Sequence, residues 1–173
     1  ACVIIAAMEI LGRTNKVRLF DDSWTGYGGS DFEVSIKNKK LIDKLFAKCD
    51  IRVGEMLKVT PVFGSDKLYC EEIDVGEEKP RQVASGLRAH FSKEEMEGRL
   101  VVVVCNLKPA KMAGFVSAGM VLCAKNSEGK IEFLEVPGVA KVGERICLEG
   151  TNQAADAWSP AKVKKKKVWE SYK

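Results

Sequence analysis

Histidine is almost missing from this 173-residue sequence: His90 is the only one, and no C-x-x-C pair accompanies it. Protein zinc sites are built from histidines and closely spaced cysteines, so we expect no metal centre. Nucleophilic catalysis needs a base beside a serine or cysteine, and His90 has no evident partner in the sequence. The phosphate-binding glycine motifs G-x-x-x-x-G-K-[ST] and G-x-G-x-x-G are also missing. We therefore predict a binding protein without catalytic residues and without a cofactor.

Long apolar runs are missing as well. No stretch approaches the roughly 20 apolar residues that a membrane-spanning helix needs. The opening segment, ACVIIAAMEI, contains Glu9 and has no basic region before it, so we do not interpret it as a signal peptide. The cysteines lie far apart, mostly within apolar patterns, which favours reduced core thiols in a cytoplasmic protein. They are Cys2, Cys49, Cys70, Cys105, Cys123 and Cys147.

Charge is unevenly distributed along the chain. The net charge is +4, but residues 99–173 hold 13 basic and 7 acidic side chains, against 15 and 17 in residues 1–98. A one-sided positive field favours a polyanion such as nucleic acid, or an anionic surface. A solvated basic tail explains the same imbalance equally well, so charge alone leaves both interpretations open.

Residues 1–48 have the pattern of a separate α+β extension. Alternating apolar residues predict strands over 16–20 and 32–37, and a Gly/Asp/Ser-rich loop separates them. The segment KKLIDKLFAK, residues 39–48, has the apolar spacing of an amphipathic helix. We interpret these residues as an N-terminal extension or as the remnant of a preceding domain.

From residue 49 to 150 the sequence predicts a mainly β domain. Short apolar segments separated by glycine-containing turns follow one another at steady intervals, ending with ERICLEG at 144–150. One short helix interrupts them, because Ser92 and Glu95 form a capping box and Gly98 supplies a stop. A five-stranded barrel with one helix between strands is the OB fold. Residues 151–173 form a basic C-terminal tail, which either docks through Trp158, Trp169 and Tyr172 or is partly disordered.

The segment VVVVCNLKPAKMAGFVSAGM, residues 101–120, holds the candidate binding residues. A strand wanted in a core leads directly into a cationic turn, in which Lys108 and Lys111 could meet phosphates. Asn106 and Ser117 could contact base edges or a 2′-hydroxyl, and Met120 could contact a base. The alternatives stay open: Met120 fits a core position, and both lysines fit an ordinary loop. The acidic pair Glu71-Glu72 is typical of solvated positions.

The same segment closely resembles the tRNA-binding domain of the endothelial-monocyte-activating polypeptide II family. Residues 105–109, 111–112, 114 and 117–120 match the family pattern LCNLKP-x-KMRG followed by S-x-GM. Further matches are DIRVGEML, LYCEEIDVGE, RQVASGL and KKKVWE, so the resemblance covers about residues 50–170 in the family's order.

This resemblance implies a non-catalytic OB domain that recruits tRNA to an aminoacyl-tRNA synthetase, in cis or in trans. Its implied partners are tRNA and a synthetase, covalently linked or in complex, and a homodimer is a further expectation. The site residues implied are Ser85, Arg88, Asn106, Lys108, Lys111, Met112, Ser117 and Met120, with tail contacts from Lys164, Lys165, Lys166 and Lys167.

Three positions depart from the family. Ala113 stands where the family usually has arginine, Glu55 where a basic residue is common, and VFGSD (62–66) replaces an HPDAD-like turn. These departures bear on RNA affinity. Two other roles known in the family also stay open: a cytokine-like signalling domain, whose active heptapeptide would align with IRVGEML (51–57), and a scaffold module of a multi-synthetase complex.

Overall fold

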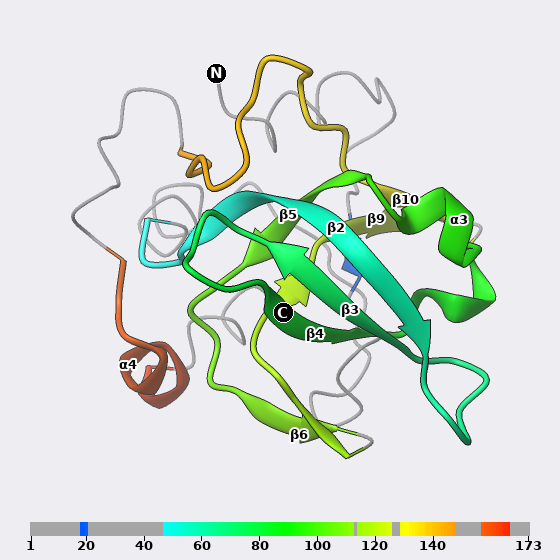
Figure 1. Cartoon of the computed structure of the whole chain (residues 1–173). Coiled ribbons are helices and arrows are strands. Elements are labelled where there is room, and N and C mark those ends of the chain that lie inside the picture. The colour runs from blue at the N-terminus through cyan, green and yellow to red at the C-terminus, as the bar shows by residue number, and fades with distance from the viewer. Residues whose placement is uncertain (1–17, 21–46, 113, 126–128, 148–156, 167–173) are drawn as a thin grey trace.

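A coiled antiparallel sheet forms the body of the molecule (Figure 1). The computed structural model describes residues 18–20, 47–112, 114–125, 129–147 and 157–166. The strand order is β4-β3-β2-β5-β8, and the edge strands β4 and β8 contact each other, which nearly closes a barrel. The predicted mainly β, OB-like fold is therefore confirmed. The strands are β2 (Ile51–Pro61), β3 (Tyr69–Asp74), β4 (Arg81–Ser85), β5 (Leu100–Val104) and β8 (Met120–Val121).

The helix between β4 and β5 begins and ends where its sequence predicts. Helix α3 (Lys93–Met96) follows the short 3₁₀ helix η2 (Leu87–Ala89). The Ser92 hydroxyl accepts the backbone N–H of Glu95, and the Glu95 carboxylate accepts the backbone N–H of Ser92 at 2.7 Å. Gly98 has a φ of +77°, which suits glycine better than any other residue. Met96 is fully buried and anchors α3 on the barrel.

Two apolar clusters share strand β5, which explains its run of four valines. Val101 and Val103 belong to the inner cluster, which also contains Met96. Val102 and Val104 belong to the outer cluster, which also contains Val163. Because side chains alternate across a strand, β5 must be apolar on both faces. The second apolar face tells us that another part of the chain covers the barrel from outside.

Residues beyond β8 supply this cover. Helix α4 (Pro160–Lys165) places Val163, only 2% exposed, in the outer cluster, and Trp158 packs against the same cluster. The described part of the predicted tail is therefore docked on the barrel. ERICLEG was predicted as a strand, but its described residues make a single bridge, Arg52↔Arg145. The expected strand is therefore reduced to one bridge to β2 in residues 144–147, and residues 148–150 lie outside the described residues.

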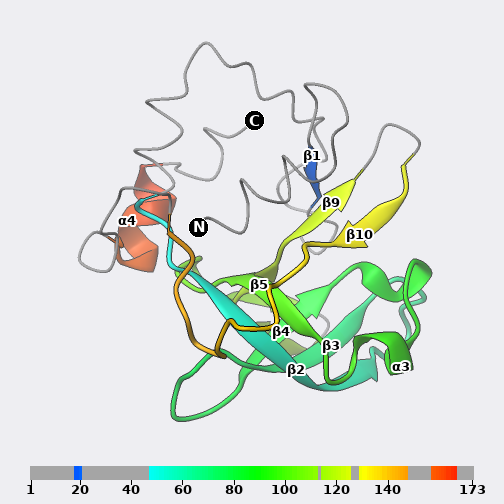
Figure 2. The ribbon, with the colours of Figure 1, turned by 90° about the horizontal axis from the view of Figure 1, so that it is seen from above.

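A second, small sheet combines residues from distant parts of the sequence. Strand β9 (Cys123–Lys125) pairs with β10 (Ile131–Phe133) on one side and with β1 (Arg18–Phe20) on the other. Figure 2 shows this sheet extending away from the barrel. The strand expected at 16–20 is thus present in part. The strand expected at 32–37 and nearly all of the expected helix lie outside the described residues. The division into 1–48, 49–150 and 151–173 stays a prediction.

The five described cysteines are free thiols, and Cys49, Cys105 and Cys123 are buried. Burial raises the pKa of the Cys105 thiol to about 11, so it stays protonated and unreactive. Within the described residues, no helix is long and apolar enough to cross a membrane.

Candidate nucleic-acid interface

The predicted binding segment forms a hairpin that projects from the barrel. Strands β6 (Ala110–Met112) and β7 (Phe115–Ser117) pair antiparallel, with Met112 opposite Phe115. The cationic turn that was predicted to hold both lysines holds only Lys108, because Lys111 lies in β6, which pairs with β7. Lys108, in the turn before β6, and Lys111, within it, are both exposed. The hairpin therefore carries two cations into solvent.

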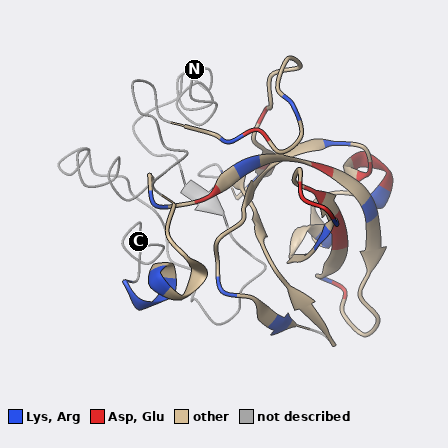
Figure 3. Cartoon of the chain, turned by 60° about the vertical axis from the view of Figure 1, so that its left-hand side comes forward, with Lys and Arg blue, Asp and Glu red and all other residues tan. Residues whose placement is uncertain are grey.

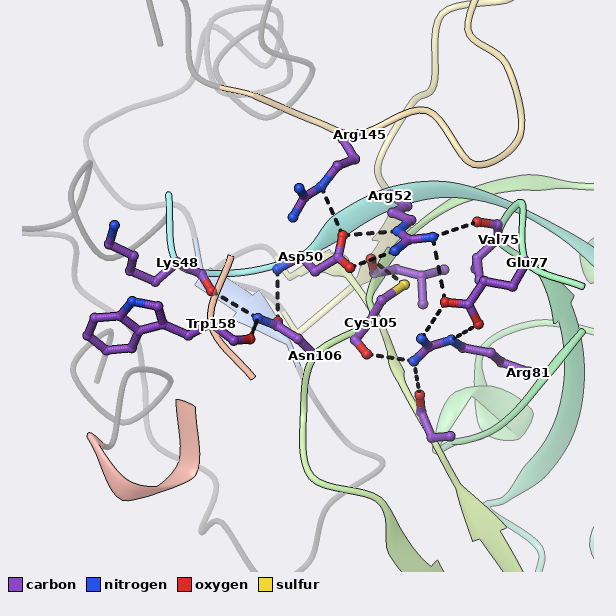
Figure 4. Close-up of polar contacts among 12 residues, drawn as sticks. Lys48, Asp50, Arg52, Val75, Glu77, Arg81, Cys105, Asn106, Arg145 and Trp158 are labelled. Carbon is purple, nitrogen blue, oxygen red and sulfur yellow. Dashed lines mark hydrogen bonds and ion pairs between the residues drawn. The ribbon is translucent and has the colours of Figure 1, made fainter. Parts of the chain in front are cut away.

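Arg81 fastens both ends of this hairpin to the barrel (Figure 4). Its Nη1 donates to the carbonyl of Cys105, just before the turn, at 2.5 Å, and to the carbonyl of Ala118, just after β7, at 2.8 Å. Its Nε and Nη2 donate to the two carboxylate oxygens of Glu77 at 2.8 and 2.6 Å. These hydrogen bonds lower the pKa of Glu77 below its usual value and raise that of Arg81. The resulting ion pair holds the guanidinium in the position that reaches both carbonyls.

Asp50 organises a second set of ion pairs beside the first. Its carboxylate accepts from Arg52 at 2.8 and 3.0 Å and lies 3.0 Å from Nε of Arg145. Burial works to raise the pKa of Asp50, but the hydrogen bond and charge of Arg52, together with Arg145, leave it below the usual value. Arg52 also lies 3.5 Å from Glu77, which links the two sets. The network thus joins β2, the β3–β4 turn and the segment around Arg145.

Asn106 lies at the start of the turn, but its amide is occupied by the protein (Figure 4). Its Oδ1 accepts the backbone N–H of Asp50 at 2.8 Å. Its Nδ2 donates to the carbonyls of Lys48 at 2.9 Å and Trp158 at 2.8 Å. Asn106 is 5% exposed, so the side chain is placed to hold three chain segments together.

Three further predicted site residues are buried. The Ser117 hydroxyl accepts the N–H of Ala84 at 3.0 Å, which ties β7 to β4. Met120, 2% exposed, packs in the outer cluster. The Ser85 hydroxyl donates to Glu71 inside the protein. A direct contact of RNA with the side chains of Asn106, Ser117, Met120 or Ser85 would require the surface to open.

Gly119 explains how the hairpin base comes so close to β4. A Cβ atom at this position would lie 3.2 Å from the Val83 side chain and 3.3 Å from the Val104 carbonyl oxygen. Such contacts are tighter than most real Cβ contacts, so glycine fits best here.

Arg88 and Met112, the two remaining predicted residues of the barrel and hairpin, are half-buried and have different surroundings. Arg88 donates through Nη1 to the Ser65 carbonyl and therefore braces the β2–β3 turn. This turn displays Phe63, whose ring is fully exposed. Met112 lies on β6, next to Lys111.

The second basic element is helix α4. Lys164, Lys165 and Lys166 are exposed, whereas Lys167 lies outside the described residues. Lys162 Nζ lies 4.3 Å from the centroid of the Trp158 ring, within range of a cation–π interaction. Figure 3 shows the basic residues of α4 on the same side of the molecule as those of the turn and β6.

Glu71 is buried although its sequence context indicated a solvated position. It was expected to be solvated, but it is fully buried, and its Oε2 has no hydrogen-bond partner among the described residues. Burial raises its pKa to about 8, which the hydrogen bond from Ser85 only partly offsets. The strand period could have revealed this, because Glu71 lies two residues from both Tyr69 and Ile73 and therefore shares their inner face of β3.

The site is suited to binding anions, because its acidic side chains, Asp50 and Glu77, are paired with arginines. Within the described ranges, no group of three or more His, Cys, Asp or Glu side chains could hold a metal ion. The exposed charged side chains of the turn and hairpin, within the described residues, are lysines, which attract phosphate without demanding one geometry. The arrangement fits a backbone-directed interaction with nucleic acid.

The family comparison agrees with this geometry. The model of the family described as "Putative tRNA binding domain" matches residues 51–145. The match begins with β2 and ends at Arg145, so it contains the barrel, the hairpin and the ion-pair network except Asp50, which lies one residue before the match.

Individual relatives combine the same domain with other parts. The chain is 47% identical over 127 residues to a cytoplasmic methionine–tRNA ligase of Arabidopsis thaliana, covering 72% of this chain but 15% of the ligase. It is 42% identical over 125 residues to the aminoacyl tRNA synthase complex-interacting multifunctional protein 1 of Cricetulus griseus, covering 72% of the chain and 33% of that protein. The chain thus spans a third or less of these two relatives.

A solved structure extends the likeness to three dimensions. The crystal structure of the C-terminal domain of Plasmodium vivax p43 superposes with a TM-score of 0.62 at 37% identity. The superposition covers 66% of this chain and 68% of the other.

Proposed function

Because this chain belongs to the tRNA-binding domain family, we propose that it binds tRNA without catalysing a reaction and delivers it to an aminoacyl-tRNA synthetase. The observation that carries this proposal is the projecting hairpin, which displays Lys108 and Lys111 and is fixed at both ends by Arg81. Because the base of the hairpin is already fixed, its backbone has little ordering cost when the two lysines meet phosphates.

The exposed and half-buried site residues have the direct roles in this proposal. Lys108 and Lys111 contact phosphates, while Arg88 and Met112 border the RNA. The buried residues hold the surface in shape: Asn106, Ser85, Ser117 and Met120. Lys164, Lys165, Lys166 and Lys167 add charge from the tail. Phosphate contacts position a protein on RNA and carry no sequence choice, so we expect binding to many tRNAs.

The test is a comparison of Lys108→Ala/Lys111→Ala with the control Lys58→Ala/Lys93→Ala. Both pairs lower the net charge equally, but Lys58 and Lys93 form ion pairs with Glu72 and Glu97 away from the hairpin. Replacing a lysine that meets a phosphate should make the slope of log K against log salt shallower by roughly 1. Affinity for a tRNA transcript, measured across salt concentrations, should fall only for the hairpin pair. Equal behaviour of the two variants would refute the assignment.

Association with a synthetase is the second half of the proposal. The relatives include a tRNA ligase and a protein named for interaction with the synthase complex, both of which are longer than this chain. We place the protein in the cytoplasm, as the name of the ligase states for that relative. Co-purification of a synthetase with the native protein, or a synthetase domain in the same gene product, tests this half.

A further inference from the structure

Two basic elements that are far apart in sequence lie on one side of the molecule (Figure 3). One is the hairpin with Lys108 and Lys111. The other is the segment 157–166, which holds four lysines and no acidic residue. All six lysines are exposed. A single polyanion could therefore meet both elements at once, provided that their relative position is fixed.

Asn106 fixes the position of the hairpin relative to α4. It begins the turn that carries Lys108, and its Nδ2 donates to the carbonyl of Trp158, two residues before α4. The same nitrogen donates to the Lys48 carbonyl, which also accepts the backbone N–H of Trp158 at 3.0 Å. One buried amide thus bonds the base of the hairpin to the start of the α4 segment.

Packing makes the attachment of α4 rigid. Val163 is 2% exposed in the outer cluster, so one face of α4 is committed to the barrel. Lys162 and Lys48 lie with Nζ 4.3 and 5.8 Å from the Trp158 ring centroid. The remaining lysines, Lys164, Lys165 and Lys166, point away from the buried face, since they are exposed while Val163 is not.

We propose that the hairpin and α4 form one phosphate-binding surface that contacts a single folded RNA at both elements simultaneously, with Asn106 as the positioning residue between them. This rests on the proposed tRNA binding and adds to it a second contact element and the residue that couples the two. The partner is recognised by its backbone charge, because lysines read phosphate and not base identity.

Lysine protection in the unmodified protein is the first test. The protein is treated with an acetylating reagent with and without saturating tRNA, and each lysine's modification is measured by mass spectrometry. Lys108, Lys111 and Lys164–Lys166 should all be protected at the same tRNA concentration, while Lys58, Lys93 and Lys130 should not. Protection of Lys108 and Lys111 alone overturns this inference but leaves the proposed function intact. Protection of neither set overturns both.

The second test measures the coupling. Lys164→Ala/Lys165→Ala/Lys166→Ala should lower the salt slope by about 3, against less than about 1 for the charge-matched control Lys58→Ala/Lys93→Ala/Lys130→Ala. In an Asn106→Ala background, shown to be folded by its unfolding transition, the same α4 substitutions should cost clearly less affinity. A purely structural role of Asn106 would leave their cost unchanged, because independent effects add. If the Asn106 variant does not fold, the protection pattern still decides the proposal.

Discussion

At the scale of single residues, Glu71 is the least expected feature of the barrel. Its carboxyl group is fully buried, and only the Ser85 hydroxyl is bonded to it among the described residues. Burial raises its pKa from the usual 4.5 to about 8. The folded protein therefore keeps a neutral carboxyl group at neutral pH, whereas the unfolded chain ionises.

This difference predicts how stability depends on pH. Between pH 4.5 and about 8 the folded state binds one proton more than the unfolded state, so the free energy of unfolding falls as pH rises through this window. One proton accounts for at most about 1.4 kcal/mol per pH unit. Glu71→Gln keeps a neutral acceptor for Ser85 and should abolish this contribution. Denaturant unfolding of both proteins at pH 5, 6, 7 and 8 checks it.

At each pH the native protein is compared with Glu71→Gln under identical conditions. Other titrating groups affect both proteins alike, so only the difference between them reports Glu71. We expect the glutamine variant to gain on the native protein steadily from pH 5 to pH 8. A difference that does not vary with pH would mean that Glu71 titrates near its ordinary value.

At the scale of elements, the stability of the β6–β7 hairpin depends on Arg81 more than on the few hydrogen bonds within the hairpin. Strands β6 and β7 have three residues each, and a two-stranded hairpin of this size is barely stable alone. The two carbonyl bonds of Arg81, with the Ser117–Ala84 bond, replace the missing local stability. The cationic turn is therefore presented by contacts that lie outside it.

Arg81→Met should free the hairpin while leaving the barrel folded. We expect faster amide hydrogen exchange across 110–117, unchanged protection in β2, β3 and β5, and weaker tRNA binding. Glu77→Gln is the graded comparison: it removes the ion pair that positions the guanidinium but keeps the guanidinium itself, so we expect a smaller effect in the same direction, since a partly exposed pair contributes at most about 1 kcal/mol. If Arg81→Met binds tRNA as tightly as the native protein, the fastening is irrelevant to binding.

Elements also show where sequence reasoning succeeds. Strands β2 to β5 and helix α3 were predictable because their causes are local: alternation, glycine turns and a capping box around Ser92. Residues 117–124 (SAGMVLCA) form one of the short apolar segments that predict strands, but the structure divides them among β7, β8 and β9. These breaks follow from partners elsewhere in the chain, since β7 pairs with β6, β8 with β5 and β9 with β10.

The residues of the candidate site also fall into two groups: those whose placement follows from local sequence and those whose placement depends on distant partners. The exposure of Lys108 and Lys111 followed from a polar turn after a buried strand. The bonds of Asn106 to Lys48 and Trp158 span 58 and 52 residues, and no local pattern marks them. A buried polar group is recognised only once its distant partners are known, and so its motif was interpreted as a contact with RNA.

At the scale of the whole molecule, the barrel and the C-terminal segment share one core. Val102 and Val104 of β5 face outward from the barrel and are covered by residues that include Ile146 and Val163. A tail that is polar in composition can therefore be part of the folded unit, because one buried valine and Trp158 supply its contact with the core. We expect the barrel and α4 to unfold together.

Val163→Ala tests whether α4 and the barrel unfold as one cooperative unit. Shortening a buried valine should lower the free energy of unfolding by about 1–3 kcal/mol, in a single transition. Val139→Ala makes the same chemical change at a side chain that is 90% exposed, and should cost less than about 0.5 kcal/mol. Urea unfolding followed by both tryptophan fluorescence and circular dichroism measures the two. If Val163→Ala leaves the unfolding curve unchanged, α4 does not belong to the cooperative unit, and the surface it shares with the hairpin lacks the rigidity that simultaneous RNA contact requires.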